Sequence, residues 1–430
     1  MAITWRAVVL VALGLVPALL VPAPFTVLAW LGLVLLACLL DVVLAASPRQ
    51  VAVRRSVPGS VRLTEATRST LTVTNRSSRR LRAVVRDAWQ PSAGAGQNRH
   101  RVSLPAGESR RLVTPLRPTR RGDRLADRVT IRSFGPLRLA ARQVSIPVPG
   151  RLRVLPEFAS RRHLPSRLAR LRELDGRTAV QIRGAGTEFD SLREYVIGDD
   201  VRSIDWRATA RRSDVVVRTW RPERDRRVLM VLDTGRLAAG RIGDLPRIDA
   251  SIEAALLLAA LASRAGDRID LIAFDRRVRT QVAGTNGPRL MPAVADALAP
   301  VEPALVETDW PGVVAAVSQR MSRRALVVLL TSLEPAAVES GLLPVVGPLA
   351  HEHTVVLASV ADPEVASLRR GRGSAAEVFD AAAAERAELE RAAVTVRLRQ
   401  RGVEVVDALP DELAPRLADT YLALKAAGRL

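Results

Sequence analysis

Residues 184–206 carry the side chains best suited to chemistry. They combine glycines, carboxylates, arginines and aromatic rings, and they show neither the alternation of a strand nor the apolar stripe of a helix. Paired carboxylates such as Asp199 and Asp200 can act as acid and base, but only in a cleft that shifts their pKa. The sequence indicates no such cleft, and it shows no Ser/His/Asp or Cys/His arrangement. We expect a non-catalytic protein. One alternative is a hydrolase that uses the carboxylates of residues 184–206, which we call the motif.

The same stretch can also form a charged network. Gly184 and Gly186 allow a tight turn, but a third glycine is missing, so a phosphate-binding loop is not expected. The carboxylates can pair with arginines and fix an orientation, while the aromatic rings would anchor the segment on the following domain by burial. A clasp between two domains and a contact surface for a partner both fit this pattern. The expected motif residues are Gly184, Gly186, Glu188, Phe189, Arg193, Tyr195, Gly198, Asp199, Arg202, Asp205 and Trp206.

Composition argues against nucleic-acid binding and against sites that need several cysteines. The 430-residue chain has a formal net charge of +21 and a pI near 11.5. Its bases are almost all arginines spread over every segment, whereas a nucleic-acid site would be a local patch. Aromatic residues make up 3% of the chain, too few for base-stacking platforms. The single cysteine, Cys38, excludes an intramolecular disulfide and a cysteine-based zinc cluster. We expect no nucleic-acid partner and a cytoplasmic location for the soluble domains.

The N-terminal region is apolar, without a charged residue from position 7 to position 40. Pro22 and Pro24 divide it into stretches 3–21 and 25–46, each long enough for a transmembrane helix of about 20 residues. Arginines flank the pair on both sides, so the positive-inside rule places both ends in the cytoplasm. The alternatives are a cleaved signal peptide and a lipoprotein site, and the long second stretch argues against both.

Strand and helix patterns divide the chain into several domains. Residues 1–48 are the expected transmembrane hairpin. Residues 49–149 contain short β segments at even spacing, which predicts a small β-sandwich, and residues 150–226 form a basic linker that ends in the motif. Residues 227–430 alternate apolar strands with amphipathic helices, which predicts a mostly parallel, Rossmann-like α/β sheet. Its expected strands are 228–232, 268–274, 278–283, 325–330, 354–360 and 403–406, with the pair within 268–283 as an antiparallel edge.

Ligands of such a sheet bind beyond the carboxyl ends of its strands, which points to Asp233 and to Thr331-Ser332. Here the sequence resembles a von Willebrand factor A-type domain, whose metal loop is Asp-x-Ser-x-Ser, completed by a Thr and an Asp. Asp233 and Thr308 match, but both serines are replaced and Ser332 stands in place of the last Asp. Arg236 would repel a cation. We expect a metal-free Asp233 and no cofactor, with a Mg²⁺-dependent ligand-binding A domain as the alternative.

The motif and the domain order resemble the domain-of-unknown-function 58 family. The likeness rests on Gly-Ala-Gly-Thr-Glu-Phe at 184–189, Leu-Arg-Glu-Tyr at 192–195, Gly198-Asp199 and Ile-Asp-Trp at 204–206, just upstream of the A-type domain. The resemblance implies a MoxR-type AAA+ ATPase as partner and a role in the maturation or assembly of other proteins. The chain is therefore expected to be a membrane-anchored, cytoplasm-facing adaptor that contacts the ATPase and client proteins.

Overall fold

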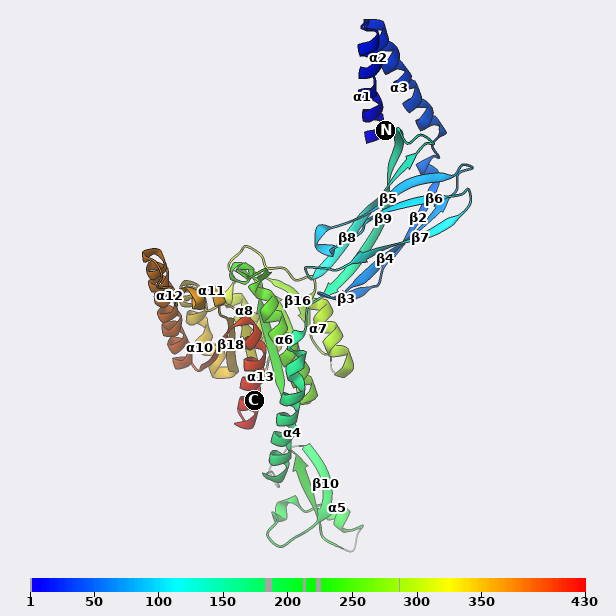
Figure 1. Cartoon of the computed structure of the whole chain (residues 1–430). Coiled ribbons are helices and arrows are strands. Elements are labelled where there is room, and N and C mark those ends of the chain that lie inside the picture. The colour runs from blue at the N-terminus through cyan, green and yellow to red at the C-terminus, as the bar shows by residue number, and fades with distance from the viewer. Residues whose placement is uncertain (1, 182–187, 212–213, 222–225, 286) are drawn as a thin grey trace. The chain divides into compact units, whose positions relative to one another are not determined.

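The structure is a computed structural model that describes residues 2–181, 188–211, 214–221, 226–285 and 287–430. The chain forms two compact units, Met1–Glu157 and Phe158–Leu430 (Figure 1). The domain boundary expected at position 149 falls inside strand β9 (Ala140–Leu155), and this whole strand belongs to the first unit.

Apolar helices begin the first unit: α1 (Trp5–Leu13), α2 (Leu15–Leu20) and α3 (Pro24–Leu44). In the described part of the chain, one helical segment, Pro24–Gln50, which consists of α3 and the short turn after it, is long and apolar enough to cross a membrane. The shorter apolar segment, Trp5–Leu20, would reach about 24 Å at 1.5 Å per residue, less than a hydrocarbon core of about 30 Å. It is shortened because Ala2–Ile3 forms strand β1, which pairs with β9. The structure thus has one candidate span, where the sequence predicted two.

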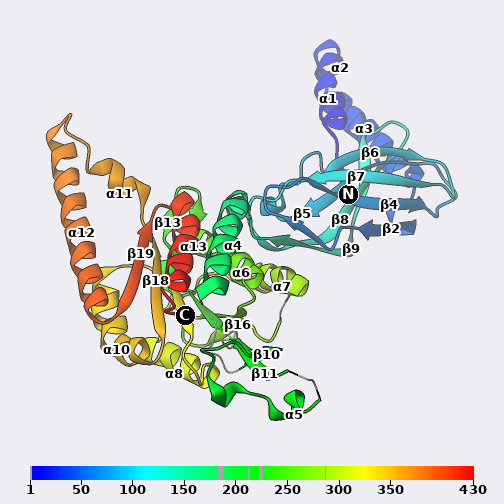
Figure 2. The ribbon, with the colours of Figure 1, turned by 90° about the horizontal axis from the view of Figure 1, so that it is seen from below.

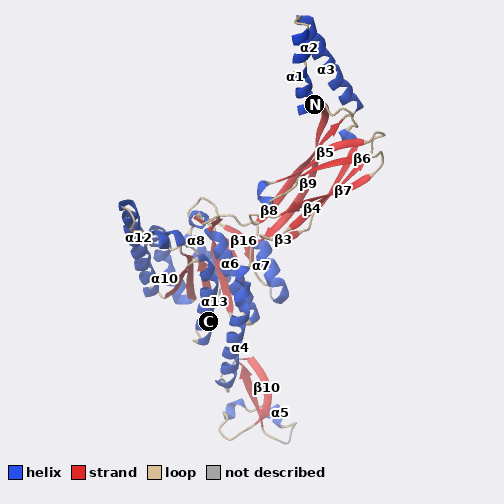
Figure 3. Cartoon of the chain, viewed as in Figure 1, coloured by secondary structure: helices blue, strands red, loops and turns tan. Residues whose placement is uncertain are grey.

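Strands build the rest of the first unit (Figure 3). They are β2 (Val51–Ser56), β3 (Ser60–Arg62), β4 (Thr67–Asn75), β5 (Leu81–Trp89), β6 (Arg99–Leu104), β7 (Ser109–Leu116) and β8 (Gly122–Phe134). One sheet has the order β1-β9-β8-β5-β6, with β3 beside β9, and the other has the order β2-β4-β7. Buried and less buried side chains alternate along β4 and β5, because successive residues of a strand face opposite sides. Leu71, Val85 and Ile131 belong to a core shared by both sheets.

Asp41, near the end of α3, fastens this helix to the sheets. Its side chain is fully buried. Oδ1 accepts a hydrogen bond from the Leu137 amide at 2.8 Å, and Oδ2 accepts from the amides of Leu139 and Ala140 at 2.8 and 3.1 Å. A Cβ added at Gly135 would lie 2.1 Å from the Asp41 carbonyl oxygen, so the turn between β8 and β9 packs directly on the helix. Sequence reasoning assigned Asp41 no role, and the structure gives it this one.

A six-stranded sheet forms the centre of the second unit. Its strands are β12 (Arg227–Asp233), β15 (Arg268–Phe274), β16 (Val278–Val282), β17 (Leu326–Leu330), β18 (Thr354–Val360) and β19 (Val403–Ala408). The order is β16-β15-β12-β17-β18-β19, and every neighbouring pair is parallel except β15 with β16. This is the expected mostly parallel sheet with an antiparallel edge. A separate two-stranded sheet joins β13 (Arg241–Ile242) to β14 (Leu245–Pro246).

Helices cover both faces of the six-stranded sheet (Figure 2). They are α4 (Leu164–Gln181), α6 (Arg247–Arg264), α7 (Leu290–Leu298), α8 (Trp310–Arg320), α9 (Pro335–Ala337), α10 (Leu343–Glu352), α11 (Pro363–Leu368), α12 (Ala375–Gln400) and α13 (Pro410–Ala426). On one face α6 and α13 pack on the strands and α4 packs on these two helices. On the other face α8, α10 and α12 contribute to one core with the strands. The strands are buried on both sides, which explains their continuous apolar runs.

The motif segment forms a small structure of its own. Strand β10 (Glu188–Glu194) pairs antiparallel with β11 (Val216–Arg221), and the short helix α5 (Trp206–Thr209) lies in the connection. Residues 188–194 thus form a strand, and a short helix begins at Trp206, although the sequence of 184–206 shows neither strand alternation nor a helical apolar stripe. Gly184 and Gly186 lie outside the described residues.

Candidate functional site

Asp199 shapes the first half of the connection between β10 and β11. Gly198 turns the chain with a left-handed backbone, φ 110°. Asp199 then accepts two hydrogen bonds from the Arg193 guanidinium, at 2.7 and 2.6 Å, and one from the Val196 amide at 2.9 Å. Bidentate arginine–carboxylate pairs are short and directional. The hydrogen bond from Arg193 holds the pKa of Asp199 below its ordinary value.

Asp205 shapes the second half. Its Oδ1 accepts hydrogen bonds from the amides of Arg207 and Ala208, both at 3.0 Å, and so caps α5. Its Oδ2 accepts a hydrogen bond from Arg218 Nε on β11 at 2.8 Å. The hydrogen bond from Arg218 lowers the pKa of Asp205. The connection is therefore tied to both strands of its own sheet.

The structure brings part of the predicted motif together. In the described part of the chain, the ion pairs of Asp199 and Asp205 stay within residues 193–218. Arg202 contributes through its amide, which donates to Asp200 Oδ1 at 3.0 Å. Tyr195 is half-buried. Glu188 and Phe189 lie in β10, and their side chains are outside the described set.

Apolar side chains stand exposed on this connection. Ile197 is 96% exposed and Trp206 is 67% exposed, and Val196 and Val201 are also exposed. The expectation that Trp206 anchors the segment by burial is wrong, because its ring faces solvent at the first position of α5. We call Val196, Ile197, Val201 and Trp206 the loop surface. Monomeric proteins seldom expose clustered large apolar side chains unless they bind something there.

A second aspartate centre lies at the carboxyl end of β12. Asp233 is buried. Its Oδ1 accepts hydrogen bonds from the Gly235 amide at 2.8 Å and the Thr308 hydroxyl at 2.5 Å, and its Oδ2 accepts one from the Thr331 hydroxyl at 2.6 Å. The structure thus brings together the predicted pair of Asp233 and Thr308. Ser332, which sequence reasoning placed at the last ligand position, instead accepts a hydrogen bond from an arginine.

These residues do not fit a divalent cation. Both oxygens of Asp233 already accept hydrogen bonds from protein groups, and Arg236 follows in the same loop, where its charge would oppose a cation. A Cβ at Gly235 would lie 2.3 Å from Thr308 Oγ1, so a serine of the metal loop has no room there. Among the described residues, no group of three or more His, Cys, Asp or Glu side chains could hold a metal. The Asp233 centre is therefore a buried carboxyl whose two oxygens both accept hydrogen bonds from protein groups.

Asp275, directly after β15, belongs to the same centre and was missed. Its Oδ2 accepts hydrogen bonds from Thr234 Oγ1 at 3.2 Å and from Arg279 Nε at 2.5 Å, and its Oδ1 accepts one from the Arg276 amide at 2.6 Å. Burial alone would raise the pKa of Asp275, but the hydrogen bonds from Arg279 and Arg276 hold it below its ordinary value. The rule that pointed to Asp233, a polar residue directly after a buried strand, would also have found Asp275.

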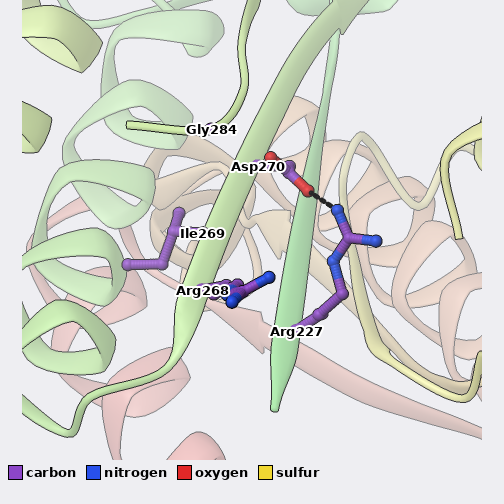
Figure 4. Close-up of a pocket in the computed structure, with 5 residues that line it drawn as sticks. All are labelled: Arg227, Arg268, Ile269, Asp270 and Gly284. Carbon is purple, nitrogen blue, oxygen red and sulfur yellow. Dashed lines mark hydrogen bonds and ion pairs between the residues drawn. The ribbon is translucent and has the colours of Figure 1, made fainter. Parts of the chain in front are cut away.

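A hollow of about 250 Å³ lies where β12 and β15 begin (Figure 4). Arg227, Arg268, Ile269, Asp270 and Gly284 line it. Arg227 donates a hydrogen bond to Asp270 Oδ2 at 2.8 Å, so these two opposite charges in the lining of the hollow balance each other. Because ligands of parallel sheets bind beyond the strand ends rather than the strand starts, we assign no ligand to this hollow.

Residues 191–404 match the model of the family described as "Protein of unknown function DUF58". This part of the chain is a DUF58-family domain. It extends from β10 to β19 and so contains both the loop surface and the Asp233 centre. The predicted motif residues Gly184, Gly186, Glu188 and Phe189 precede the matched part.

Uncharacterized proteins of Mycobacterium bovis and Mycobacterium tuberculosis are similar to this DUF58-domain chain. Each is 27% identical over 152 residues, which is 35% of this chain and 48% of the relative. The match thus spans about half the length of these relatives, and their names carry no activity.

Solved structures resemble the chain only distantly. Native alpha-2-macroglobulin from Escherichia coli, from domain MG7 to its C-terminus, shares 19% identity with a TM-score of 0.21, over 26% of this chain and 18% of that one. The CARDB domain of the PF1109 protein from Pyrococcus furiosus shares 18% identity with a TM-score of 0.16, over 23% of this chain and 93% of that one. Neither likeness bears on the function of the DUF58 domain.

Proposed function

We propose that this protein is a membrane-anchored, cytoplasm-facing adaptor or scaffold that acts with a MoxR-type AAA+ ATPase in protein maturation or complex assembly, and that it catalyses no reaction itself. The loop surface carries the proposal. Its four large apolar side chains are exposed, and the connection that presents them is fixed by the ion pairs of Asp199 and Asp205. Exposed apolar side chains that alternate with charged ones along one connection have the composition of a protein contact site.

The fixed shape of the loop surface supports binding to a protein partner. A connection that is already ordered loses less conformational entropy when it binds than a flexible one does. Tryptophan and arginine also contribute more binding energy per residue than other types. Trp206 lies on this surface, with Arg202 and Arg207 exposed close by in the sequence.

The α/β unit would serve as the scaffold. The strand order with one antiparallel edge, and the position of Asp233 after β12, support its assignment as a von Willebrand factor A-like domain. The closed carboxyl of Asp233 would hold the strand ends together where other A-type domains hold a metal. The two packed sheets of the first unit, a small β-sandwich in this proposal, would connect this scaffold to the anchor.

The membrane anchor would be a hairpin formed by α1–α2 and α3, with both ends in the cytoplasm, in which the shorter α1–α2 arm would require local thinning of the bilayer. The apolar side chains of α3 are largely exposed, which is the surface that lipid would cover. Arg6 lies in the first turn of α1 and Arg49 follows α3, in keeping with a cytoplasmic placement of both ends. Reporter fusions at the C-terminus test this topology. A C-terminus outside the cell would overturn the orientation and the ATPase partner together.

Reciprocal pull-downs from membranes, with and without ATP, test the partner. We expect the full chain to recover a MoxR-type AAA+ ATPase, and Ile197→Ser and Trp206→Ser to recover about a tenth as much, which corresponds to roughly 1.4 kcal/mol. The matched control is Val113→Ser, which removes an exposed valine from β7 in the first unit. Recovery of no such ATPase, or equal recovery by all variants, would count against the proposal.

A further inference from the structure

Helix α12 has one face in the core and one face in solvent. It packs on β19, which is an edge strand of the six-stranded sheet, and on α11. Its buried residues are Ala381, Ala384, Val394 and Leu398. In both ribbon views α12 lies at one side of the α/β unit (Figures 1 and 2). Most of the helix surface is therefore open.

The solvent face carries an apolar stripe with heptad spacing. Its positions are Phe379, Ala382, Arg386, Leu389, Ala393 and Val396, which follow each other at intervals of three and four residues. At 3.6 residues per turn this stripe lies opposite the buried side. Phe379 is 76% exposed, Leu389 is 65% exposed and Val396 is 52% exposed. Spacing of this kind is the seam by which two helices pack in a coiled coil.

Charges are distributed unevenly along the same helix. Residues 375–390 contain five carboxylates and one arginine, whereas residues 391–400 contain three arginines and no carboxylate. Glu385 and Arg399 flank the stripe on one side, and Glu390 and Arg397 flank it on the other. The helix is thus acidic in its first half and basic in its second half, along both borders of the apolar stripe.

We propose that this stripe is the interface at which two copies of the chain pair through antiparallel α12 helices. A two-fold axis close to residues 392–393 would place the acidic stretch around residues 385–390 of each copy against the basic stretch around residues 397–399 of the other. Glu385 would then face Arg399 of the second copy, and Glu390 would face Arg397 of the second copy. A parallel pairing would instead bring like charges together, which is unfavourable.

The contacts within one copy are compatible with this pairing. Arg369 binds Glu385 and Arg397 binds Glu339, both at 2.6 Å, but these are exposed ion pairs that contribute little. Their carboxylates and guanidinium groups can accept a further partner. Arg386, the charged residue within the stripe, pairs with Glu390 at 2.9 Å, so the stripe gains no unbalanced charge. The inference rests on α12 alone and is independent of the proposed ATPase partner.

Light scattering of the full chain in detergent, over a range of protein concentrations, measures the pairing. We expect a dimer for the natural sequence and a dissociation constant that rises roughly tenfold or more in Leu389→Glu, because an unpaired carboxylate would be buried in the seam. The control is Val278→Glu, on the exposed side of the opposite edge strand β16. At concentrations where both variants are monomeric, thermal unfolding should be the same for both, since both sites are exposed in one copy. A monomeric natural protein, or a Leu389→Glu variant that pairs as tightly, overturns the proposal.

A charge exchange tests the antiparallel direction. Glu385→Arg with Glu390→Arg makes both borders of the stripe basic in the paired region, and we expect the dissociation constant to rise roughly tenfold. Adding Arg397→Glu and Arg399→Glu to this variant restores opposite charges in an antiparallel pair and should return the constant towards that of the natural chain. If the fourfold variant stays as weak as the double variant, the antiparallel pairing is wrong.

Discussion

Asp233 and Asp199 have the same carboxylate side chain, but one lies in a buried site and the other on an open connection. Each accepts three hydrogen bonds, but Asp233 is buried and receives them from two hydroxyls and one amide, whereas Asp199 lies on an open connection and receives two of them from a guanidinium. Burial raises the pKa of Asp233, and the Arg193 hydrogen bond lowers the pKa of Asp199.

The difference lies in what each site stabilises. Removing a buried acceptor leaves its donors without water or protein partners, so the carboxyl of Asp233 contributes to folding. Donors on an open connection regain water when their acceptor is removed, so Asp199 contributes mainly to the shape of the loop surface. One aspartate holds the sheet ends together and the other presents a surface.

Asp233→Ala should have the largest effect. It leaves the hydroxyls of Thr308 and Thr331 and the Gly235 amide unpaired in a buried site, at a cost of about 2–4 kcal/mol in the free energy of unfolding of the α/β unit. Denaturant titration measures this cost. Asp244→Ala, at a fully exposed carboxyl, is the control and should change little. An equal effect of the two substitutions would contradict the role of the buried centre.

The pKa of Asp233 should lie above the ordinary value of 3.8, and the pKa of Asp199 should lie below it. Because burial raises the folded-state pKa of Asp233, the folded protein keeps a proton that the unfolded chain has lost, and stability falls as the pH rises through that interval. The lowered pKa of Asp199 gives a contribution that is present above the unfolded pKa and is lost as the pH falls through the folded pKa. Carboxyl-carbon NMR would show this order, and an Asp233 that titrates below Asp199 would disprove it.

Asp199→Ala should loosen the connection without unfolding the domain. The Val196 amide donates to Asp199 Oδ2, so its hydrogen exchange should become several-fold faster, while exchange in β12 stays unchanged. Asp214→Ala, an exposed aspartate in the same connection, serves as the control. Unchanged exchange at Val196 would show that the ion pair does not order the turn.

Trp206→Ser should have a small effect on stability, within about 0.5 kcal/mol, because the ring is exposed. Trp310→Ser removes a buried ring of the α/β core and should cost about 3 kcal/mol or more in the same denaturant titration. Similar costs for both tryptophans would mean that Trp206 is buried in solution and that the loop surface does not exist as described.

Added Mg²⁺ should have the smallest effect. Calorimetry on the full chain in detergent is expected to give no saturable heat, since the Asp233 oxygens already accept three hydrogen bonds. Saturable binding that disappears in Asp233→Ala would instead favour the metal-dependent A domain.

The six-stranded sheet was the most predictable part of the fold. The strands predicted at 268–274 and 354–360 coincide with β15 and β18, and the one predicted at 228–232 lies within β12. A strand that is covered on both faces is a continuous run of apolar residues, so it can be recognised locally.

The candidate sites depend on contacts that a local pattern does not contain. Thr308 and Thr331 lie 75 and 98 residues from Asp233 in the sequence. The strand β10 escaped prediction because its pairing with β11 is irregular between Phe189 and Ser191, which disturbs the alternation of a strand. The exposure of Trp206 follows from its place in α5, which no apolar pattern marked.

The contacts around Asp41 determine how movement of α3 reaches the β-sheets. Besides the three amides that Asp41 accepts from, the Thr4 hydroxyl donates to the Arg138 carbonyl and the Arg79 guanidinium donates to the Val43 carbonyl. The end of α3 is therefore held against the turn between β8 and β9, and Thr4, directly before α1, is held on the same turn. We therefore expect a tilt of α3 to move the turn between β8 and β9, and with it the ends of these two strands.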